Sequence, residues 1–385
     1  MSVCPICNSA LVEPFIEFKS IPVTQNMLYK TKDESIRAMC KDIRLAYCKI
    51  CGFVFSLDFT QSDIEYSEDY NNDQRMSKLF TQYYNSQIAW LKNNYININD
   101  TIAEIGCGKG YYINRLAQVI GGKGNKYGFD TTYDGKINSL EGVRFYKNYF
   151  SEEFNNLNID FAICRHVIEH IQKPVDFLKL IRGSIKENAL LFIETPDFNW
   201  IIENTIFFDL NSEHCSYFTE NSLSRVLQLA NFKIIETMSG FDGQYMWFVA
   251  QASENADIKW DSKIYSVDKY KKFQHESEIA RDKYINLFKK HKKNKKTTAI
   301  WGAGAKGNVL LNLIDKEHTL INYVIDIHNE KKYKYVGGTG HQVIPPSDIE
   351  KNDISDILVL NPNYYNEICG EVSQIMDITK LNIFM

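Results

Sequence analysis

The 385-residue chain carries 44 Lys and Arg against 48 Asp and Glu, a formal net charge of −4 at pH 7. This balance gives no reason to expect nucleic acid or an anionic membrane surface as a partner, and the length predicts about two to three domains. Residues 1–10 lack a basic start followed by an apolar core, and no apolar run is long enough to span a membrane. We therefore expect a cytoplasmic protein.

Two CxxC pairs stand near the N-terminus, in the segments CPIC and CKIC. In a reducing compartment such pairs are typical of a tetrahedral four-thiolate zinc site, because each pair lets two sulfurs converge on one ion. The segment between the pairs must then form its own hairpin or lid. A redox CxxC is the alternative, and the remaining five of the nine cysteines are interpreted as small buried or incidental thiols. We predict a zinc-binding domain over residues 1–65 with a structural zinc on Cys4, Cys7, Cys48 and Cys51.

The next segment, residues 66–95, combines a polar stretch with a predicted helix over residues 76–91. A helix at this place can cover the mouth of a cofactor site. Tyr66 and Tyr70 precede it, and a phenol can donate a hydrogen bond to a ligand. Packing of these tyrosines at a domain joint is the alternative.

A cofactor loop is predicted at residues 101–111, TIAEIGCGKGY. The apolar run 102–105 predicts a buried strand, and the glycines that follow predict a tight turn into a helix. A dinucleotide fingerprint reads GxGxxG, whereas the alternating glycines here resemble motif I of the class I S-adenosylmethionine-dependent methyltransferases. In that motif a downstream acid holds the ribose, and an ordinary glycine turn is the alternative. The predicted cofactor residues are Glu104, Gly106, Gly108, Gly110 and Asp130.

From residue 100 to 253, strand and helix patterns alternate as in a parallel α/β domain. Strands are predicted near 102–105, 127–130, 143–146, 159–164 and 189–194, and helices near 111–120, 174–186 and 219–230. Two more strands, 233–239 and 244–252, flank a turn and predict an antiparallel hairpin at the end of the sheet. This hairpin distinguishes a methyltransferase fold from a dinucleotide-binding fold. We predict a methyltransferase domain with its leading helix over residues 66–255.

Polar residues follow the fourth and fifth predicted strands, where ligands bind in sheets of this kind. Arg165 and His166 lie in the segment CRHVIEHI and are assigned to the cofactor edge, with His170 nearby. Glu213 and His214 lie in the loop LNSEHCSYF. A histidine titrates near neutrality, which suits it to proton removal. A satisfied structural histidine is the alternative.

A charged segment predicts a helical connector over residues 256–296, whose basic end is interpreted as a solvated face. A second α/β domain is predicted over residues 297–385. Its segment WGAGAKG has the GxGxxG spacing of a dinucleotide fingerprint, and Asp326 stands near the expected acid position. The loop amides and Lys306 can meet a diphosphate, and Asn361 and Tyr364 can face the same cleft.

Four features together, CPIC with CKIC, EIGCGKG with Asp130, RHVIEH, and SEHCSYF, resemble the sugar C-methyltransferases that act on nucleotide-linked ketosugars. The resemblance implies a zinc-binding N-terminal domain, a class I (Rossmann-like) methyltransferase domain and a C-terminal Rossmann-like domain that walls the sugar-nucleotide cleft. It implies S-adenosylmethionine as cofactor, with Glu213 and His214 at the sugar and His214 as the proposed base. The chain departs from the family at Asn211, where a tyrosine is usual.

The predicted function is therefore C-methylation of a nucleotide-linked ketosugar, in which His214 removes the proton beside the ketone and the enolate accepts the methyl group. Sugar O- or N-methylation, an NAD(P)-dependent oxidoreductase using the second glycine loop, and a zinc-dependent nucleic-acid module are the alternatives.

Overall fold

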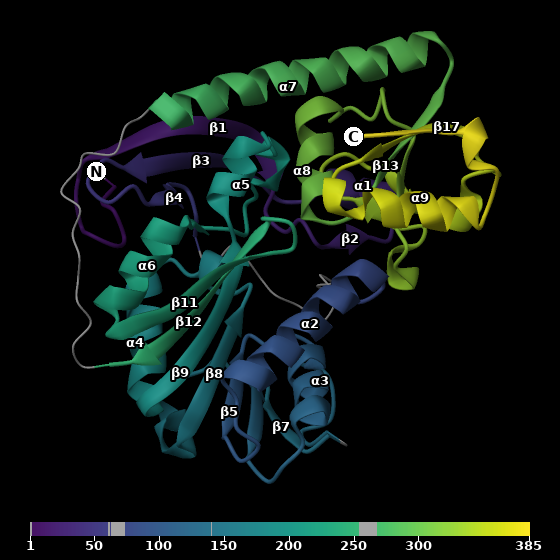
Figure 1. The fold of residues 1–385 in the computed structure, drawn as a ribbon. Coiled ribbons are helices and arrows are strands. Elements are labelled where there is room, and N and C mark those ends of the chain that lie inside the picture. The colour runs from purple at the N-terminus through teal and green to yellow at the C-terminus, as the bar shows by residue number, and fades with distance from the viewer. Residues whose placement is uncertain (1, 61, 63–73, 140, 254–267) are drawn as a thin grey trace.

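The computed structural model describes residues 2–60, 62, 74–139, 141–253 and 268–385. Three β-sheets organise this part of the chain, and a long helix bridges the first and the last of them (Figure 1). Tyr66 and Tyr70 lie outside the described residues, as do the predicted domain limits at 65/66 and 255/256, so these remain predictions. No helix in the described ranges is both long and apolar enough to cross a membrane.

The N-terminal sheet has four strands in the order β1-β3-β4-β10. β1 (Val12–Pro22) and β3 (Cys40–Cys48) pair antiparallel, so the segment between the CxxC pairs does form a hairpin-like unit. β4 (Val54–Ser56) continues the sheet, and β10 (Ser216–Tyr217) joins it from the central part of the chain. The short helix α1 (Lys32–Ile36) begins with a capping box between Thr31 and Glu34.

The central sheet has seven strands in the order β11-β12-β9-β8-β5-β6-β7. Six strands run in the same direction, and β12 lies antiparallel between β9 and β11. This order confirms the predicted terminal hairpin and the class I methyltransferase fold. The strands are β5 (Ile102–Ile105), β6 (Lys126–Phe129), β7 (Val143–Tyr146), β8 (Ile159–Arg165), β9 (Ile185–Pro196), β11 (Phe232–Gly240) and β12 (Tyr245–Ala252).

Helices flank both faces of the central sheet, which explains why β5 is buried along its whole length. α4 begins at Pro174, whose fixed φ suits the first helical position, and α6 begins with a capping box on Thr219. β9 starts at Ile185, four residues earlier than predicted, and follows the last residue of α4, Ser184, without an intervening loop. The helices are α2 (Lys78–Asn94), α3 (Tyr111–Ile120), α4 (Pro174–Ser184), α5 (Phe198–Glu203) and α6 (Glu220–Leu229).

The C-terminal sheet has seven strands in the order β18-β17-β13-β14-β16-β15-β2. Its edge strand β2 (Leu28–Tyr29) comes from the N-terminal segment and pairs with β15. The remaining strands are β13 (Thr297–Trp301), β14 (Tyr323–Ile325), β15 (Tyr335–Val336), β16 (Gln342–Ile344), β17 (Ile354–Val359) and β18 (Asn382–Phe384). The helices are α8 (Ala305–Ile314) and α9 (Tyr365–Ser373).

Helix α7 (Asp268–Lys293), predicted as the connector, runs above β1 toward the C-terminal sheet (Figure 1). At its start Tyr270 stacks on Tyr47 with ring centroids 4.7 Å apart. Near its end Phe288 packs against Phe384 of β18. The helix therefore fixes the distance between the N-terminal and C-terminal sheets. Short 3-10 turns complete the described structure: η2 (Glu152–Leu157), η3 (Ile168–His170), η4 (Phe207–Asp209), η5 (Asn329–Lys331), η6 (Pro346–Asp348), η7 (Pro362–Tyr364) and η8 (Ile378–Lys380).

Candidate active site

A cleft of about 440 Å³ lies between the carboxyl ends of the central and C-terminal sheets. It brings together residues from the loops after β8 and β9, the second glycine loop after β13, and the start of α9. Parallel α/β sheets bind ligands at this end of their strands. The predicted residues that line it are Arg165, His166, His170, Glu213, His214, Lys306 and Asn361.

The first glycine loop follows β5 and has the shape that a cofactor cradle needs. Gly106, Gly108 and Gly110 all have left-handed φ values, of 74°, 53° and 76°. A Cβ on Gly106 would lie 2.2 Å from Val167, so only glycine fits there, whereas a Cβ on Gly108 would meet nothing within 4 Å. Gly108 therefore presents an open backbone surface to a ligand.

Asp130 holds this loop from the end of β6. Its carboxylate accepts hydrogen bonds from the Gly108 amide at 2.8 Å and from the Thr132 amide at 2.7 Å. Such a carboxylate is preoriented at the loop, where an acid of this fold grips ribose hydroxyls.

Glu104 lies beneath the same loop. Its buried carboxylate accepts a hydrogen bond of 3.0 Å from the Ile113 amide in the first turn of α3. Burial raises the pKa of Glu104 to about 7. Its assigned role at the cofactor remains a prediction, and the contact that the structure gives it stabilises the start of α3.

Arg165 and His166 meet at a residue that the sequence did not single out, Glu194 at the end of β9. Arg165 donates to the Glu194 carboxylate at 2.9 Å, and Nε2 of His166 lies 2.8 Å from the same oxygen. Tyr83 of α2 donates to the other oxygen at 2.6 Å. The two basic residues are thus held at the cleft by one buried carboxylate.

His166 is charged in this setting. Burial would lower the pKa of His166, but Glu194 and Glu169 outweigh it and raise the pKa to about 9. The residue has a φ of 53°, a left-handed conformation that is uncommon for histidine. A protonated ring held in this conformation places a fixed positive group at the cleft.

His214, Glu213 and His170 do converge, as predicted. The rings of His170 and His214 meet edge to face with centroids 4.8 Å apart, and His170 Nδ1 lies 3.0 Å from the Glu213 carbonyl. Burial, then the neighbouring His170, lowers the pKa of His214 from 6.5 to about 3. His214 is therefore a neutral imidazole at neutral pH, with a proton affinity below that of an exposed histidine.

Glu169 completes this group. Burial would raise the pKa of Glu169, but the hydrogen bond with His166 and the nearby imidazoles outweigh this effect and lower the pKa to about 2. Its carboxylate accepts a hydrogen bond of 3.1 Å from Thr195. Donor atoms of Glu169, His170 and His214 all lie within 4.8 Å of one another.

The second glycine loop lines the cleft, whereas the predicted cofactor residues Gly106, Gly108, Gly110 and Asp130 are not among the lining residues. Asp326 accepts the Ala303 amide at 2.9 Å, as Asp130 accepts the Gly108 amide. Lys331, which sequence reasoning missed, lies 3.1 Å from Asp326, and Lys306 forms an ion pair with Asp209. The only sequence feature that could have indicated Lys331 was its position five residues after Asp326.

Asn361 connects the C-terminal domain to the central domain. Its side-chain amide donates at 2.9 Å to the side-chain oxygen of Gln244, in the turn between β11 and β12. Tyr364, three residues on, packs on Phe241 of that turn with ring centroids 5.4 Å apart. These contacts close one end of the cleft.

The four CxxC thiols gather at one point. Sγ of Cys4 lies 3.4 Å from Sγ of Cys51, and Sγ of Cys7 lies 3.5 Å from Sγ of Cys48. All four sulfurs lie within 4.8 Å of one another, a donor set that fits tetrahedral zinc.

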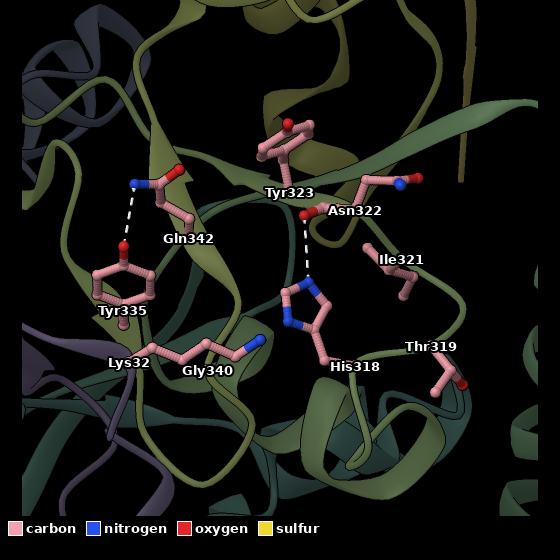
Figure 2. A pocket seen from close by; sticks show the side chains of 9 residues that line it. All are labelled: Lys32, His318, Thr319, Ile321, Asn322, Tyr323, Tyr335, Gly340 and Gln342. Atoms are coloured by element: carbon pink, nitrogen blue, oxygen red, sulfur yellow. Dashed lines mark hydrogen bonds between the residues drawn. The ribbon is translucent and has the colours of Figure 1, made fainter. Parts of the chain in front are cut away.

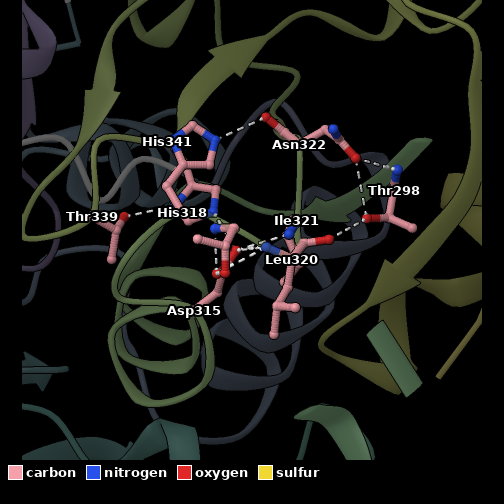
Figure 3. A network of polar contacts seen from close by, with 9 residues as sticks. Thr298, Asp315, His318, Leu320, Ile321, Asn322, Thr339 and His341 are labelled. Carbon is pink, nitrogen blue, oxygen red and sulfur yellow. Dashed lines mark hydrogen bonds and ion pairs between the residues drawn. The ribbon is translucent and has the colours of Figure 1, made fainter. Parts of the chain in front are cut away.

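A second hollow, of about 340 Å³, opens at the other end of the C-terminal sheet and is separate from the cleft (Figure 2). Beneath it Asp315 accepts the Ile321 amide at 2.8 Å and faces His341 at 3.1 Å, while His341 contacts Thr339 at 2.8 Å (Figure 3). Since Asp315, Thr339 and His341 are all buried, this network stabilises the turns of the sheet.

Comparison with known proteins agrees with this architecture. Residues 79–237 match a family model described as a methyltransferase domain, and residues 252–384 match one described as a C-methyltransferase C-terminal domain. The chain therefore contains a methyltransferase domain followed by a C-methyltransferase C-terminal domain, the two catalytic-region domains that the resemblance implied. The protein is a methyltransferase.

Among curated relatives, this methyltransferase is similar to the C-methyltransferase NovU of Streptomyces niveus, with 22% identity over 225 residues. The alignment covers 55% of the chain and 54% of NovU, so it spans about half of each protein.

Solved methyltransferases are similar to this chain over somewhat less than half of its length. A putative methyltransferase in complex with the Trm112 activator of Haloferax volcanii is 13% identical, covers 47% of this chain and 94% of its own, and has a TM-score of 0.40. An S-adenosylmethionine-dependent methyltransferase of Aquifex aeolicus is 17% identical, with 46% and 97% covered and a TM-score of 0.36.

Proposed function

We propose that this methyltransferase transfers a methyl group to a carbon atom of a nucleotide-linked ketosugar, with His214 as the base. The observation that carries the proposal is the neutral His214 beside Glu213 and His170, in a cleft that the methyltransferase domain shares with the C-methyltransferase C-terminal domain. A proton on the carbon next to a ketone is acidic enough for an imidazole to remove when it is held in place.

S-adenosylmethionine would supply an electrophilic methyl group, held by the Gly108 surface and Asp130. His214 takes the proton from the carbon beside the ketone, and the electron pair of that C–H bond becomes an enolate. Bound S-adenosylmethionine would supply the methyl group that the enolate carbon accepts, with the methyl–sulfur electron pair remaining on sulfur, and His214 would keep the removed proton. The protein contributes mainly proximity, orientation and this one base.

The second glycine loop is proposed to bind the nucleotide diphosphate of the same substrate. Lys306 and Lys331 place two positive charges beside it, each balanced by a carboxylate, Asp209 and Asp326. A diphosphate would share these ammonium groups and the loop amides. Tyr66, Tyr70 and Asn361 remain proposed substrate contacts.

A structural zinc is proposed on Cys4, Cys7, Cys48 and Cys51. The support is the convergence of the four sulfurs, which leaves no position for a reacting water.

Two substitutions test the assignment. His214→Asn should lower kcat at least about 100-fold, the usual size of a base effect, while the Kd for S-adenosylhomocysteine stays within about twofold. Asp130→Ala should instead raise that Kd at least about tenfold, equivalent to about 1.4 kcal/mol. Isothermal titration and steady-state kinetics measure both, and full activity of His214→Asn would overturn the proposal.

The product decides between carbon and heteroatom transfer. With a labelled methyl donor, NMR of the product should show the methyl carbon coupled to a sugar carbon. A methyl bonded to oxygen or nitrogen would establish the alternative O- or N-methyltransferase, and a thermal shift with NAD(P) but none with S-adenosylhomocysteine would favour an oxidoreductase.

A further inference from the structure

The loop that carries the base is built on one side chain, Asn211. Its carboxamide oxygen accepts hydrogen bonds from the amides of Glu213 and His214, each 3.1 Å long. An asparagine that accepts the amides two and three residues ahead forces the backbone into a tight turn. The direction in which Glu213 and His214 leave the chain therefore depends on this oxygen.

Asn211 is itself clamped through its backbone. The Tyr217 hydroxyl accepts the Asn211 amide at 3.1 Å and donates to the Asn211 carbonyl at 3.1 Å. Tyr217 belongs to β10, which pairs with β4 of the N-terminal sheet. Both Asn211 and Tyr217 are buried, so these bonds do not compete with water.

The other side of the turn is held by the N-terminal segment. The Glu213 carboxylate accepts the amides of Gln25 at 2.7 Å and Asn26 at 3.4 Å. His170 contacts the Glu213 carbonyl and the edge of the His214 ring. Asn211 and Tyr217 thus orient the backbone of the base, while Gln25 and Asn26 orient its acidic neighbour.

We propose that Asn211 is a positioning residue for His214, and that it acts through the two amides of the turn and not through contact with the sugar. The inference rests on the proposed role of His214. Asn211 is itself among the residues that line the cleft, but only 2% of it is exposed, and its carboxamide oxygen is already bonded to the two amides.

The test replaces the carboxamide while following kcat and KM separately. Asn211→Ala removes the acceptor, and we expect kcat to fall about 10- to 100-fold, the scale of a small displacement of a reacting group. The KM for the sugar nucleotide and the Kd for S-adenosylhomocysteine should stay within about twofold. Asn211→Asp keeps an oxygen for both amides, so it should recover most of kcat.

A double-mutant cycle checks the mechanism. Tyr217→Phe removes the clamp on the same turn, and the double variant Asn211→Ala/Tyr217→Phe should be no slower than the slower single variant, because both changes loosen one structure. Independent, multiplying losses would contradict the proposal. Tyr217→Phe and Asn211→Asp also keep the test usable if Asn211→Ala folds poorly.

A matched control separates positioning from stability. Asn322 also accepts a backbone amide through its side chain, that of Thr298 at 2.9 Å, but lies at the far end of the C-terminal sheet (Figure 3). Asn322→Ala should lower Tm and leave kcat per folded enzyme unchanged.

Three outcomes would overturn the inference. A raised KM with unchanged kcat in Asn211→Ala would make Asn211 a substrate contact. Failure of Asn211→Asp to recover kcat would show that the acceptor oxygen is not what matters. An Asn211→Ala variant with full kcat would remove its role altogether, whereas full activity of His214→Asn would instead remove the proposed function.

Discussion

At the scale of the residue, burial sets the protonation state of His214, the proposed base. Burial and the nearby His170 lower the pKa of His214 to about 3, so the neutral form persists far below the 6.5 of an exposed histidine. We expect kcat to stay level from about pH 8 down to about pH 5. A pH profile at saturating substrate measures this, and an acid limb with an apparent pKa near 6.5 that His214→Asn abolishes would contradict it.

The same shift has a consequence for stability. Because the folded pKa of His214 lies below the unfolded value, the unfolded chain binds the proton more readily. The contribution of His214 to stability is therefore fully present above pH 6.5 and is lost as pH falls toward 3. His166 has the opposite sign, since its raised pKa gives a contribution that is lost as pH rises through about 9.

Among the elements, α2 is tied to α9 across the cleft by one carboxylate. Glu367 accepts the amides of Lys78 at 2.5 Å and Leu79 at 3.1 Å, and the Ser77 hydroxyl at 2.6 Å. It therefore caps the start of α2, whose first amides have no partner within the helix.

Glu367→Ala should accordingly reduce the free energy of unfolding by about 1–2 kcal/mol, the range for loss of a helix cap. Urea unfolding followed by circular dichroism measures it. Glu371→Gln, one turn further along α9 and also lining the cleft, is the control and should change stability by less than about 0.5 kcal/mol. Equal losses in the two variants would show that the cap contributes nothing specific.

The sequence pattern predicted the helices and strands more accurately than it predicted the contacts between them. The apolar run 102–105 and the paired strands around residues 240–243 were enough to predict the central sheet, because a buried strand and a hairpin each have a local signature. The CxxC spacing likewise predicted that four thiols would cluster, and the structure places them together. Strand β2 escaped prediction, since two residues with partners near the other end of the chain have no local pattern.

The residues of the candidate site likewise fall into those that the sequence predicted and those that it missed. Glu213 and His214 were found because they stand on a loop beyond a strand end, a position that the fold makes functional. Glu194 and Lys331 were missed, and so were the contacts of Gln25 with Glu213, because charge partners from distant segments are set by tertiary packing.

On the scale of the whole molecule, the proposed zinc centre and the catalytic loop share one sheet. β3 ends at Cys48, and β1 leads through Pro22 toward the Gln25 and Asn26 amides that hold Glu213. Loss of the metal should therefore disturb the active site as well as lower stability.

Cys48→Ser is the test of that coupling. We expect it to lose bound zinc, to lower Tm, and to reduce kcat of the protein that remains folded. Atomic absorption, thermal unfolding and kinetics measure the three effects. Cys369→Ser, which alters a cysteine without a CxxC partner, should keep one zinc per chain and full activity. A zinc-free Cys48→Ser protein with normal kcat would show that the two sites are independent.

The pairing of β10 with β4, and of β2 with β15, also constrains the order in which the sheets can fold. During synthesis the N-terminal segment leaves the ribosome first, but two strands that complete its neighbourhood come from the middle and the end of the chain. Contacts this distant in sequence slow folding and leave strand edges open in the interim. The N-terminal sheet is thus completed only after the middle of the chain has been synthesised, and separate expression of the N-terminal or the C-terminal sheet would leave it without one of its strands.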